Sequence, residues 1–378
     1  MSENIHMLEY IYENPHALVQ TFKNNAESIN KLVSECIARS IDRIVLTGLG
    51  SSYTAAKMAE PLFQMLLKQP VYVFHSDDIE FFEPVLIDER TLLIVISRSG
   101  ERGAVIDAIE TGERKGAISV GVTGVEDSML AKKSTRSLIT GEGPEITFPK
   151  TKSVTACAGV LMQLGLAYAG QTGRNNTAQS AEMVQDLKSQ LYKIPDKLKA
   201  SIPVIDRGIK EIINQIKDCS AISVAGSISN YGVALESAVK IQEASNRFTR
   251  SDTLAGLLHG PLGAVNLNWA VLLMITEKDG KLNDDILKTA NKLKARTISV
   301  YSGKVEYSVE PEFTIHLPDS TDDLLAGLLY LPVVQLMAYH WTISLGMNPD
   351  APAAMMDILN SILPEGREEP EFRKNKGG

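Results

Sequence analysis

An internal repeat constrains the fold of this 378-residue chain more than any other feature, because three apolar runs recur in the same order in both halves. In the first half the runs are Ile44–Gly48, Leu92–Ile96 and Ile118–Val120. In the second half they are Ile222–Gly226, Val271–Ile275 and Ile298–Val300. Ser97 and Thr276 close the second runs, 49 and 50 residues beyond Gly48 and Gly226, and the third runs begin 70 and 72 residues beyond them. Such matched intervals predict a duplicated domain. Two unrelated domains with similar strand spacing are the alternative.

Short apolar strands that alternate with helix-length segments predict parallel sheets covered by helices on both faces, an α/β fold. Right-handed crossovers then place the carboxyl ends of all strands at one edge of each sheet. Each repeat closes with a long apolar helix, Val154–Ala169 or Leu324–Leu345. We predict a helical arm over 1–40, a first domain over 41–180, a second over 181–350 and a tail over 351–378.

Composition narrows the class of protein. The net charge of −8 argues against broad electrostatic binding of nucleic acid. The three cysteines, Cys36, Cys157 and Cys219, are far apart and form no disulfide framework or metal-binding spacing, which favours a reducing cytosol. The N-terminus has no apolar signal core, and Pro332 and His340 interrupt the most membrane-like stretch, so we predict a buried helix there. We expect a cytoplasmic protein with no metal, organic cofactor or membrane partner.

Two serine-rich loops follow first-half strands and open helices. Gly48-Leu49-Gly50-Ser51-Ser52 is the first, and Ser97-Arg98-Ser99-Gly100-Glu101-Arg102 is the second. Glycine lets the backbone approach a ligand closely, and hydroxyls and helix N-terminal amides can donate to a phosphate. The candidate phosphate ligands are Ser51, Ser52, Ser97, Arg98, Ser99 and Arg102. The alternative is that the serines only cap helices. Neither loop has the spacing of an ATP or dinucleotide motif.

A charged stripe follows Gly226 in the second half. Glu236, Lys240 and Glu243 stand at i, i+4 and i+7, so they share one side of a predicted helix, and His259-Gly260-Pro261 follows sixteen residues later. A carboxylate and a histidine can move protons at a sugar carbon and a sugar oxygen. The alternative is a solvated helix face stabilised by ion pairs, with His259 in an ordinary loop.

These strings resemble the tandem sugar isomerase (SIS) domains that form the isomerase half of glutamine–fructose-6-phosphate aminotransferases. Gly50-Ser51-Ser52-Tyr53 resembles the family's G-T-S-Y loop, and Ser97-Arg98-Ser99-Gly100-Glu101 resembles S-Q-S-G-E. Pro144-Glu145-Ile146 with Thr151-Lys152-Ser153 resembles the E-I-x-V-A-S-T-K segment. Ala234-Leu235-Glu236, Lys240, Glu243 and His259-Gly260-Pro261 match A-L-E-x-x-x-K-x-x-E and H-G-P without a gap.

The resemblance implies two three-layer α/β/α domains with parallel central sheets and a 6-phosphosugar substrate. It implies that Glu243 moves a proton between C1 and C2, and that His259 assists ring opening. Glu236 and Lys240 would support the site. In the family the histidine comes from the neighbouring subunit, so the resemblance also implies a homodimer with shared active sites.

Departures from the family pattern leave the substrate open. No glutaminase segment is present in this sequence, so we expect no glutamine-dependent amination from this chain alone. Asp357 stands where the family carries a lysine that reaches the substrate carbonyl, and Arg102 stands where the family has threonine. An amino-sugar-phosphate isomerase or deaminase, a fructosamine-6-phosphate deglycase and a non-catalytic sugar-phosphate sensor remain alternatives. A pure sensor needs neither Glu243 nor His259.

Overall fold

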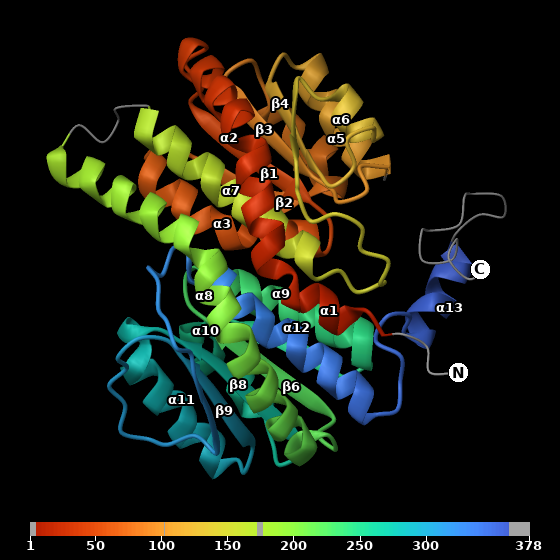
Figure 1. The fold of residues 1–378 in the computed structure, drawn as a ribbon, viewed down its shortest axis with the longest axis vertical. Helices are drawn as coiled ribbons and strands as arrows, with labels where there is room; N and C mark the ends of the chain where they lie inside the picture. The colour runs from red at the N-terminus through yellow and green to blue at the C-terminus, as the bar shows by residue number, and fades with distance from the viewer. Residues whose placement is uncertain (1–4, 102, 172–176, 363–378) are drawn as a thin grey trace.

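The computed structural model describes residues 5–101, 103–171 and 177–362. It contains two five-stranded, all-parallel sheets with helices on both faces (Figure 1). The sheet orders are β2-β1-β3-β4-β5 and β10-β9-β8-β6-β7. Counted along each half, both sheets have the order 2-1-3-4-5. The shared order confirms the duplicated α/β fold that the repeat predicts.

The first half begins with the helices α1 (Met7–Tyr12) and α2 (Asn14–Ala38). Its strands are β1 (Arg43–Gly48), β2 (Val71–His75), β3 (Thr91–Ile96), β4 (Ile118–Thr123) and β5 (Arg136–Ile139). The helical segments between and after them are α3 (Ser51–Leu67), η1 (Ser76–Asp78), α4 (Ile79–Leu86), α5 (Gly103–Arg114), α6 (Met129–Lys133) and α7 (Lys152–Gln171).

The second half begins with the long helix α8 (Ala178–Ile216). Its strands are β6 (Ala221–Gly226), β7 (Phe248–Asp252), β8 (Trp269–Ile275), β9 (Arg296–Tyr301) and β10 (Phe313–His316). The remaining segments are α9 (Ser229–Ser245), α10 (Leu254–Leu258), η2 (Pro261–Ala264), η3 (Glu277–Asp279), α11 (Gly280–Lys292), α12 (Ala326–Ser344) and α13 (Ala353–Ile362).

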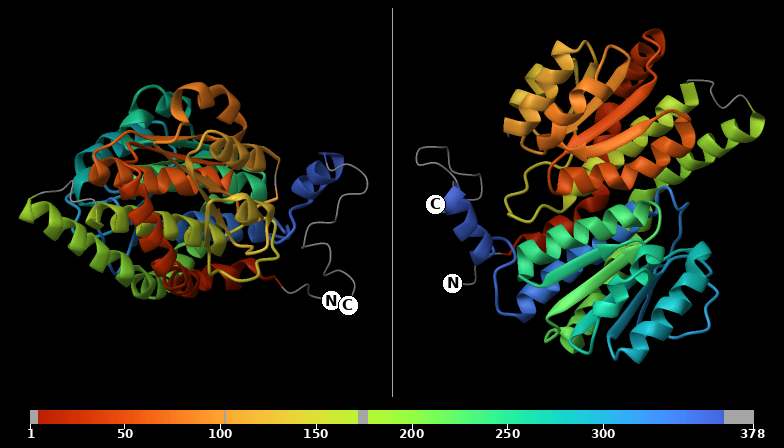
Figure 2. Two further views of the ribbon diagram at one scale, coloured as in Figure 1. Left: turned by 90° about the horizontal axis from the view of Figure 1, so that it is seen from above. Right: turned by 180° about the vertical axis from the view of Figure 1, so that it is seen from behind.

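The two halves pack through one continuous apolar core. Buried residues of α2, α3, α7, α8, α9 and α12 form a single cluster between the sheets. Smaller clusters lie on the outer face of each sheet. Helices α3 and α9 contact each other at the centre of the molecule, where the views from the front and from behind both place them (Figures 1 and 2). Side chains from opposite halves therefore meet along these two helices.

The repeat detected only the inner strands of each sheet. Every residue of β3, β4 and β6 is buried, so these strands read as unbroken apolar runs. The four edge strands, β2, β5, β7 and β10, are four or five residues long and carry exposed or half-buried positions. Because they lie at the sheet edges, their composition resembles that of loops.

The helix α7 is long and apolar enough to cross a membrane by length and composition. Its apolar window is 89% buried within the protein, as in a core helix. The stretch Leu328–Leu345, which we singled out as membrane-like, lies largely within α12, whose first thirteen residues are all buried.

Candidate functional site

Both serine-rich loops lie at the carboxyl edge of the first sheet, after the neighbouring strands β1 and β3. The strand order reverses between β1 and β3, and ligands of open α/β sheets bind at such a switch point. Gly50 is the N-cap of α3, with φ +53°, and no side chain caps this helix. The prediction that Ser51 and Ser52 might be mere N-caps is therefore wrong, and both side chains are half-buried at the start of α3.

In the second loop the Ser97 hydroxyl accepts a hydrogen bond from the Gly100 amide at 3.2 Å, which closes the turn. Ser97 is buried, whereas Arg98 and Ser99 are half-buried at the sheet edge. Arg102, the last predicted phosphate ligand, lies outside the described residues. The structure thus brings Ser51, Ser52 and Ser99 to the same edge of the first sheet.

The charged stripe of α9 is buried, and the solvated-face alternative is wrong. Glu236 is 0% exposed and Lys240 is 1% exposed. Glu243, at the outer end of the stripe, keeps 24% of its side chain accessible. Burial of two charged groups without compensation costs several kcal/mol, so such groups are found paired.

The stripe is paired both within α9 and across to the first half. The Lys240 ammonium lies 2.7 Å from a Glu243 oxygen and 3.5 Å from a Glu236 oxygen. From the first half of the chain, the Ser51 hydroxyl donates a hydrogen bond to Glu236 Oε1 at 3.0 Å. The Thr54 hydroxyl donates to Glu236 Oε2. The first serine loop and the charged stripe therefore form one site at the contact of α3 and α9.

The pKa values of the two buried groups, Glu236 and Lys240, are both raised, but for different reasons. Burial raises the pKa of Glu236 above its usual range, against the opposing effects of Lys240 and the Thr54 hydroxyl. Burial alone lowers the pKa of Lys240, but Glu243 and Glu236 together hold that pKa above its ordinary value. Lys240 therefore stays charged, and its ammonium lies 2.7 Å from Glu243, the carboxylate at the accessible end of the stripe.

His259 lies away from the stripe within one chain. Helix α9 runs back from the carboxyl edge of the second sheet, so Glu243 lies near the point where β7 begins. His259 follows β7 and α10 and is exposed beyond the opposite, carboxyl end of that strand. The five residues of β7 alone span about 16 Å at ordinary strand rise. Among the described residues, one chain does not bring the predicted acid–base pair together.

Two supporting residues escaped the sequence interpretation. Thr54 lies one turn after Ser51 and contacts the same carboxylate, a spacing that could have indicated its role. Glu145, which is 0% exposed, accepts hydrogen bonds from the amides of Thr151, Lys152 and Ser153 at the start of α7. The E-I segment of the family resemblance thus secures a helix N-terminus beside the site.

The position that resembles the site of the family's tail lysine lies on α13. Asp357, at the aligned position, is exposed on α13. Figures 1 and 2 show α13 projecting from the body of the protein, apart from both sheets.

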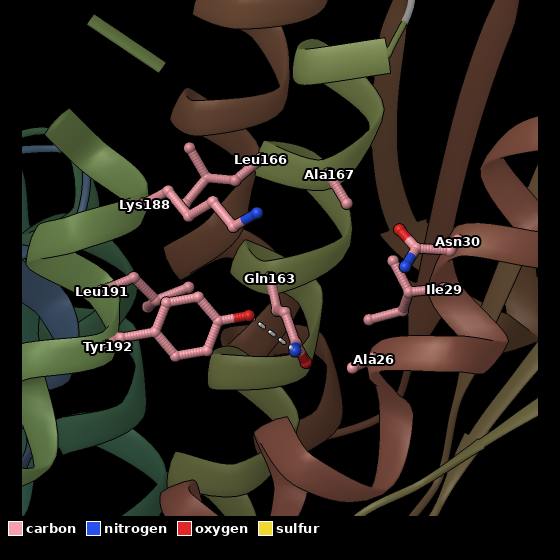
Figure 3. Close-up of a pocket in the computed structure, with 9 residues that line it drawn as sticks. All are labelled: Ala26, Ile29, Asn30, Gln163, Leu166, Ala167, Lys188, Leu191 and Tyr192. Carbon is pink, nitrogen blue, oxygen red and sulfur yellow. Dashed lines mark hydrogen bonds between the residues drawn. The ribbon is translucent and has the colours of Figure 1, made fainter. Parts of the chain in front are cut away.

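A separate pocket of about 110 Å³ lies between α2, α7 and α8 (Figure 3). Tyr192 and Gln163 face each other across it, with the amide of Gln163 donating to the Tyr192 hydroxyl at 3.2 Å. None of the predicted site residues lines this pocket. In the described part of the chain, no group of three metal-binding side chains comes together either.

Comparisons with known proteins point to the same family as the sequence motifs. Residues 37–167 match the SIS domain family. The glutamine–fructose-6-phosphate aminotransferase of Thermococcus kodakarensis is 30% identical over 348 residues, which are 92% of this chain and 56% of the relative. The chain spans little more than half the length of the aminotransferases that it matches.

Two solved structures share the fold across both halves. The C-terminal domain of the aminotransferase from Francisella tularensis aligns with a TM-score of 0.79 and 23% identity, covering 93% of this chain and 99% of that domain. A glucosamine-6-phosphate deaminase from Thermotoga maritima aligns with a TM-score of 0.71 and 23% identity, covering 92% and 97% of the two chains.

Proposed function

Because this chain is a SIS domain protein that resembles the isomerase part of glutamine–fructose-6-phosphate aminotransferases, we propose that it is a phosphosugar isomerase or deaminase. Its substrate is an open-chain 6-phosphosugar or amino-sugar phosphate. The observation that carries this proposal is the buried Glu236–Lys240–Glu243 stripe held against the first serine loop. A solvated ion-pair face would not be enclosed in this way.

The phosphate of the substrate binds at the carboxyl edge of the first sheet. Ser52 and Ser99 contribute hydroxyl groups, and the first-turn amides of α3 point to the same edge. Ser51, whose hydroxyl donates to Glu236, positions the second-half stripe rather than serving the phosphate alone. The open chain of the sugar then extends from this edge toward Glu243.

Glu243 takes the proton from the sugar carbon next to the carbonyl and returns it to the neighbouring carbon. The carbonyl oxygen gains a proton as the enediol or enamine forms and keeps it as a hydroxyl, while the oxygen or nitrogen on the neighbouring carbon loses its proton as the new carbonyl or imine forms. Lys240 is kept charged by its two carboxylate neighbours and positions Glu243 through their 2.7 Å ion pair. The reaction as derived uses only side chains and needs neither a metal nor an organic cofactor.

His259 supplies the second proton-transfer group, for ring opening or for the carbonyl oxygen. Since the histidine of one chain lies at the far end of β7 from Glu243, we infer that the partner's copy completes the site in a homodimer. The enzyme acts in the cytoplasm, where its three buried free cysteines stay reduced.

A deglycase acting on fructosamine 6-phosphates is the second candidate function. The exposed Asp357 favours it, because that position offers no lysine to form a Schiff base with a substrate carbonyl. A sensor without turnover is the candidate of another class, and the enclosed Lys240–Glu243 pair argues against it.

A panel of 6-phosphosugars and their amino derivatives separates these functions. Ammonia release identifies a deaminase, free amino acid with hexose phosphate identifies a deglycase, and ketose–aldose exchange identifies an isomerase. Tight binding with no turnover of any substrate would establish the sensor.

The base is tested by Glu243→Gln on the best substrate of that panel. We expect turnover to fall by about 10²–10⁴-fold, the usual contribution of a general base. Met65→Gln is the matched control, because Met65 occupies the corresponding place on α3 and is 61% exposed. Unchanged turnover in the Glu243 variant would rule out this base.

A further inference from the structure

A buried carboxylate lies beside the second serine loop and has no role in the mechanism above. Glu142 follows β5 at the carboxyl edge of the first sheet, and its side chain is 1% exposed. Neither of its carboxylate oxygens accepts a hydrogen bond of good geometry within the described part of the chain, although the nearby Thr140 hydroxyl helps to lower its pKa. A buried carboxylate without hydrogen bonds is costly, so its retention calls for an explanation.

The nearest opposite charge belongs to the phosphate loop. Arg98 Nε lies 3.9 Å from Glu142 Oε1, which is close enough for attraction but too long for a hydrogen bond. The backbone carbonyl of Arg98 accepts from the Thr123 hydroxyl at 3.0 Å and from the Gly124 amide at 3.0 Å, so the arginine backbone is fixed. Its side chain is 19% exposed at the sheet edge, between Glu142 and the loop of the proposed anion site.

The other ionisable groups around Glu142 do not compensate its charge. Glu145 of the same loop adds a second negative charge, and the buried Cys157 of α7 is a neutral thiol whose pKa is raised by burial. Burial raises the pKa of Glu142 itself, although Arg98 opposes that effect. Arg98 is thus the cationic group that favours the ionised form of Glu142.

We propose that Glu142 is a positioning residue for phosphate: it holds Arg98 at the sheet edge in the free protein and takes up a proton when a bound anion draws Arg98 away. This inference rests on the proposed anion site in the Ser97–Gly100 loop. The bound anion shares the charge of Arg98 and adds negative charge nearby. Both effects favour the protonated form of Glu142.

A group whose pKa is higher in the bound state than in the free state takes up protons on binding, so affinity rises as the pH falls through that interval. The limit is one proton per anion, which corresponds to about a tenfold change in affinity per pH unit. Phosphate itself titrates near pH 6 and would mask this effect.

Sulfate is therefore the probe, since it keeps its charge across the range. Calorimetric titration in buffers of different ionisation enthalpy, from about pH 5 to pH 8, counts the protons taken up per sulfate. For the wild type we expect proton uptake and an affinity that falls by up to about tenfold per pH unit. For Glu142→Gln we expect no uptake and a pH-independent affinity at least equal to that of the wild type at low pH.

Arg98→Gln gives a second, independent readout. Without the guanidinium the pKa of Glu142 should lie still higher in both states, so sulfate should bind more weakly and with less proton uptake than in the wild type. Compared with Glu142→Gln, the variant Glu142→Asp should regain part of the proton uptake, because it returns a carboxylate to the same position.

Proton uptake that persists in Glu142→Gln, or its absence in a wild type that binds sulfate, would overturn the role of Glu142. Those results would leave the anion site and the proposed enzyme intact. Failure of both sulfate and inorganic phosphate to bind the wild type would remove the anion site on which the inference rests. Turnover in the substrate panel tests the enzymatic proposal separately.

Discussion

Helices α3 and α9 occupy the same place in the two halves, and their backbones match closely. Each has 17 residues and follows a residue in an unusual conformation: Gly50 with φ +53° and ψ −125°, and Ile228 with φ +55° and ψ −119°. Each also ends at a left-handed residue, Lys68 or Asn246. The duplication has therefore kept the backbone even where isoleucine replaces glycine.

The side chains of the two helices have diverged. Adding 178 to a residue number of α3 gives its counterpart in α9, which pairs Met58 with Glu236, Leu62 with Lys240 and Met65 with Glu243. The contacts between the helices are reciprocal. Glu236 contacts Ser51 and Thr54, whereas Met58 contacts Ser229 and Gly232 at the equivalent positions. The same crossing thus builds a buried charged site on one side and a close, uncharged contact on the other.

The loops that follow β3 and β8 have also diverged in the side chains that close their turns. In the second half the carboxylate of Asp279 accepts hydrogen bonds from the Thr276 amide and hydroxyl, both at 3.0 Å. An internal carboxylate therefore fills the position where a bound anion would need donors. In the first half the Ser97 hydroxyl, not a carboxylate, accepts the amide that closes the turn. One of the two equivalent loops remains open to a phosphate.

The largest effect on stability is expected at the buried charged residues of α9. Lys240→Met leaves Glu236 buried without its counter-charge, and we expect a loss of about 3–5 kcal/mol of unfolding free energy. The double variant Glu236→Met/Lys240→Leu copies the α3 pattern into α9, so it should recover most of that loss while remaining inactive. Urea unfolding measures both. A double variant as unstable as the single one would contradict the pairing of the two helices.

A smaller effect is expected where the two helices approach each other most closely. A Cβ at Gly232 would lie 2.5 Å from the backbone nitrogen of Met58, so Gly232→Ala must push α3 and α9 apart. We expect a cost of about 1–3 kcal/mol, measured by chemical denaturation. The control is Gly170→Ala in α7, where the nearest atom is 3.8 Å away and the substitution should be neutral or slightly stabilising. Equal responses of the two variants would argue against a tight helix contact.

The smallest effect is expected at the residue that precedes each helix, Gly50 or Ile228, whose unusual backbone conformation both halves share. Ile228 holds a conformation that suits glycine and is 42% exposed, so Ile228→Gly should release strain with little loss of packing. We expect a gain of about 1 kcal/mol after the greater flexibility of glycine in the unfolded chain is counted. The mirror variant Gly50→Ala should lose a similar amount, although its Cβ meets no neighbour. Thermal melting of the two variants should shift in opposite directions.

Much of the architecture could be predicted from sequence because the inner strands are buried on both faces. Runs such as Leu92–Ile96 and Val271–Ile275 have few alternatives to a central strand, and their spacing revealed the duplication. The edge strands escaped because solvent allows polar residues in them. Strand β7, for example, reads Phe-Thr-Arg-Ser-Asp and has no apolar run.

For the candidate site, the sequence by itself determined that Glu236, Lys240 and Glu243 share one side of a helix. It did not determine whether that side faces water, because periodicity does not say what covers a helix face. Only the tertiary structure decided this, by packing Ser51 and Thr54 of α3 against a carboxylate 185 and 182 residues away. The first half of the chain removes water from the stripe, and that burial distinguishes a candidate acid–base site from an ordinary surface ion pair.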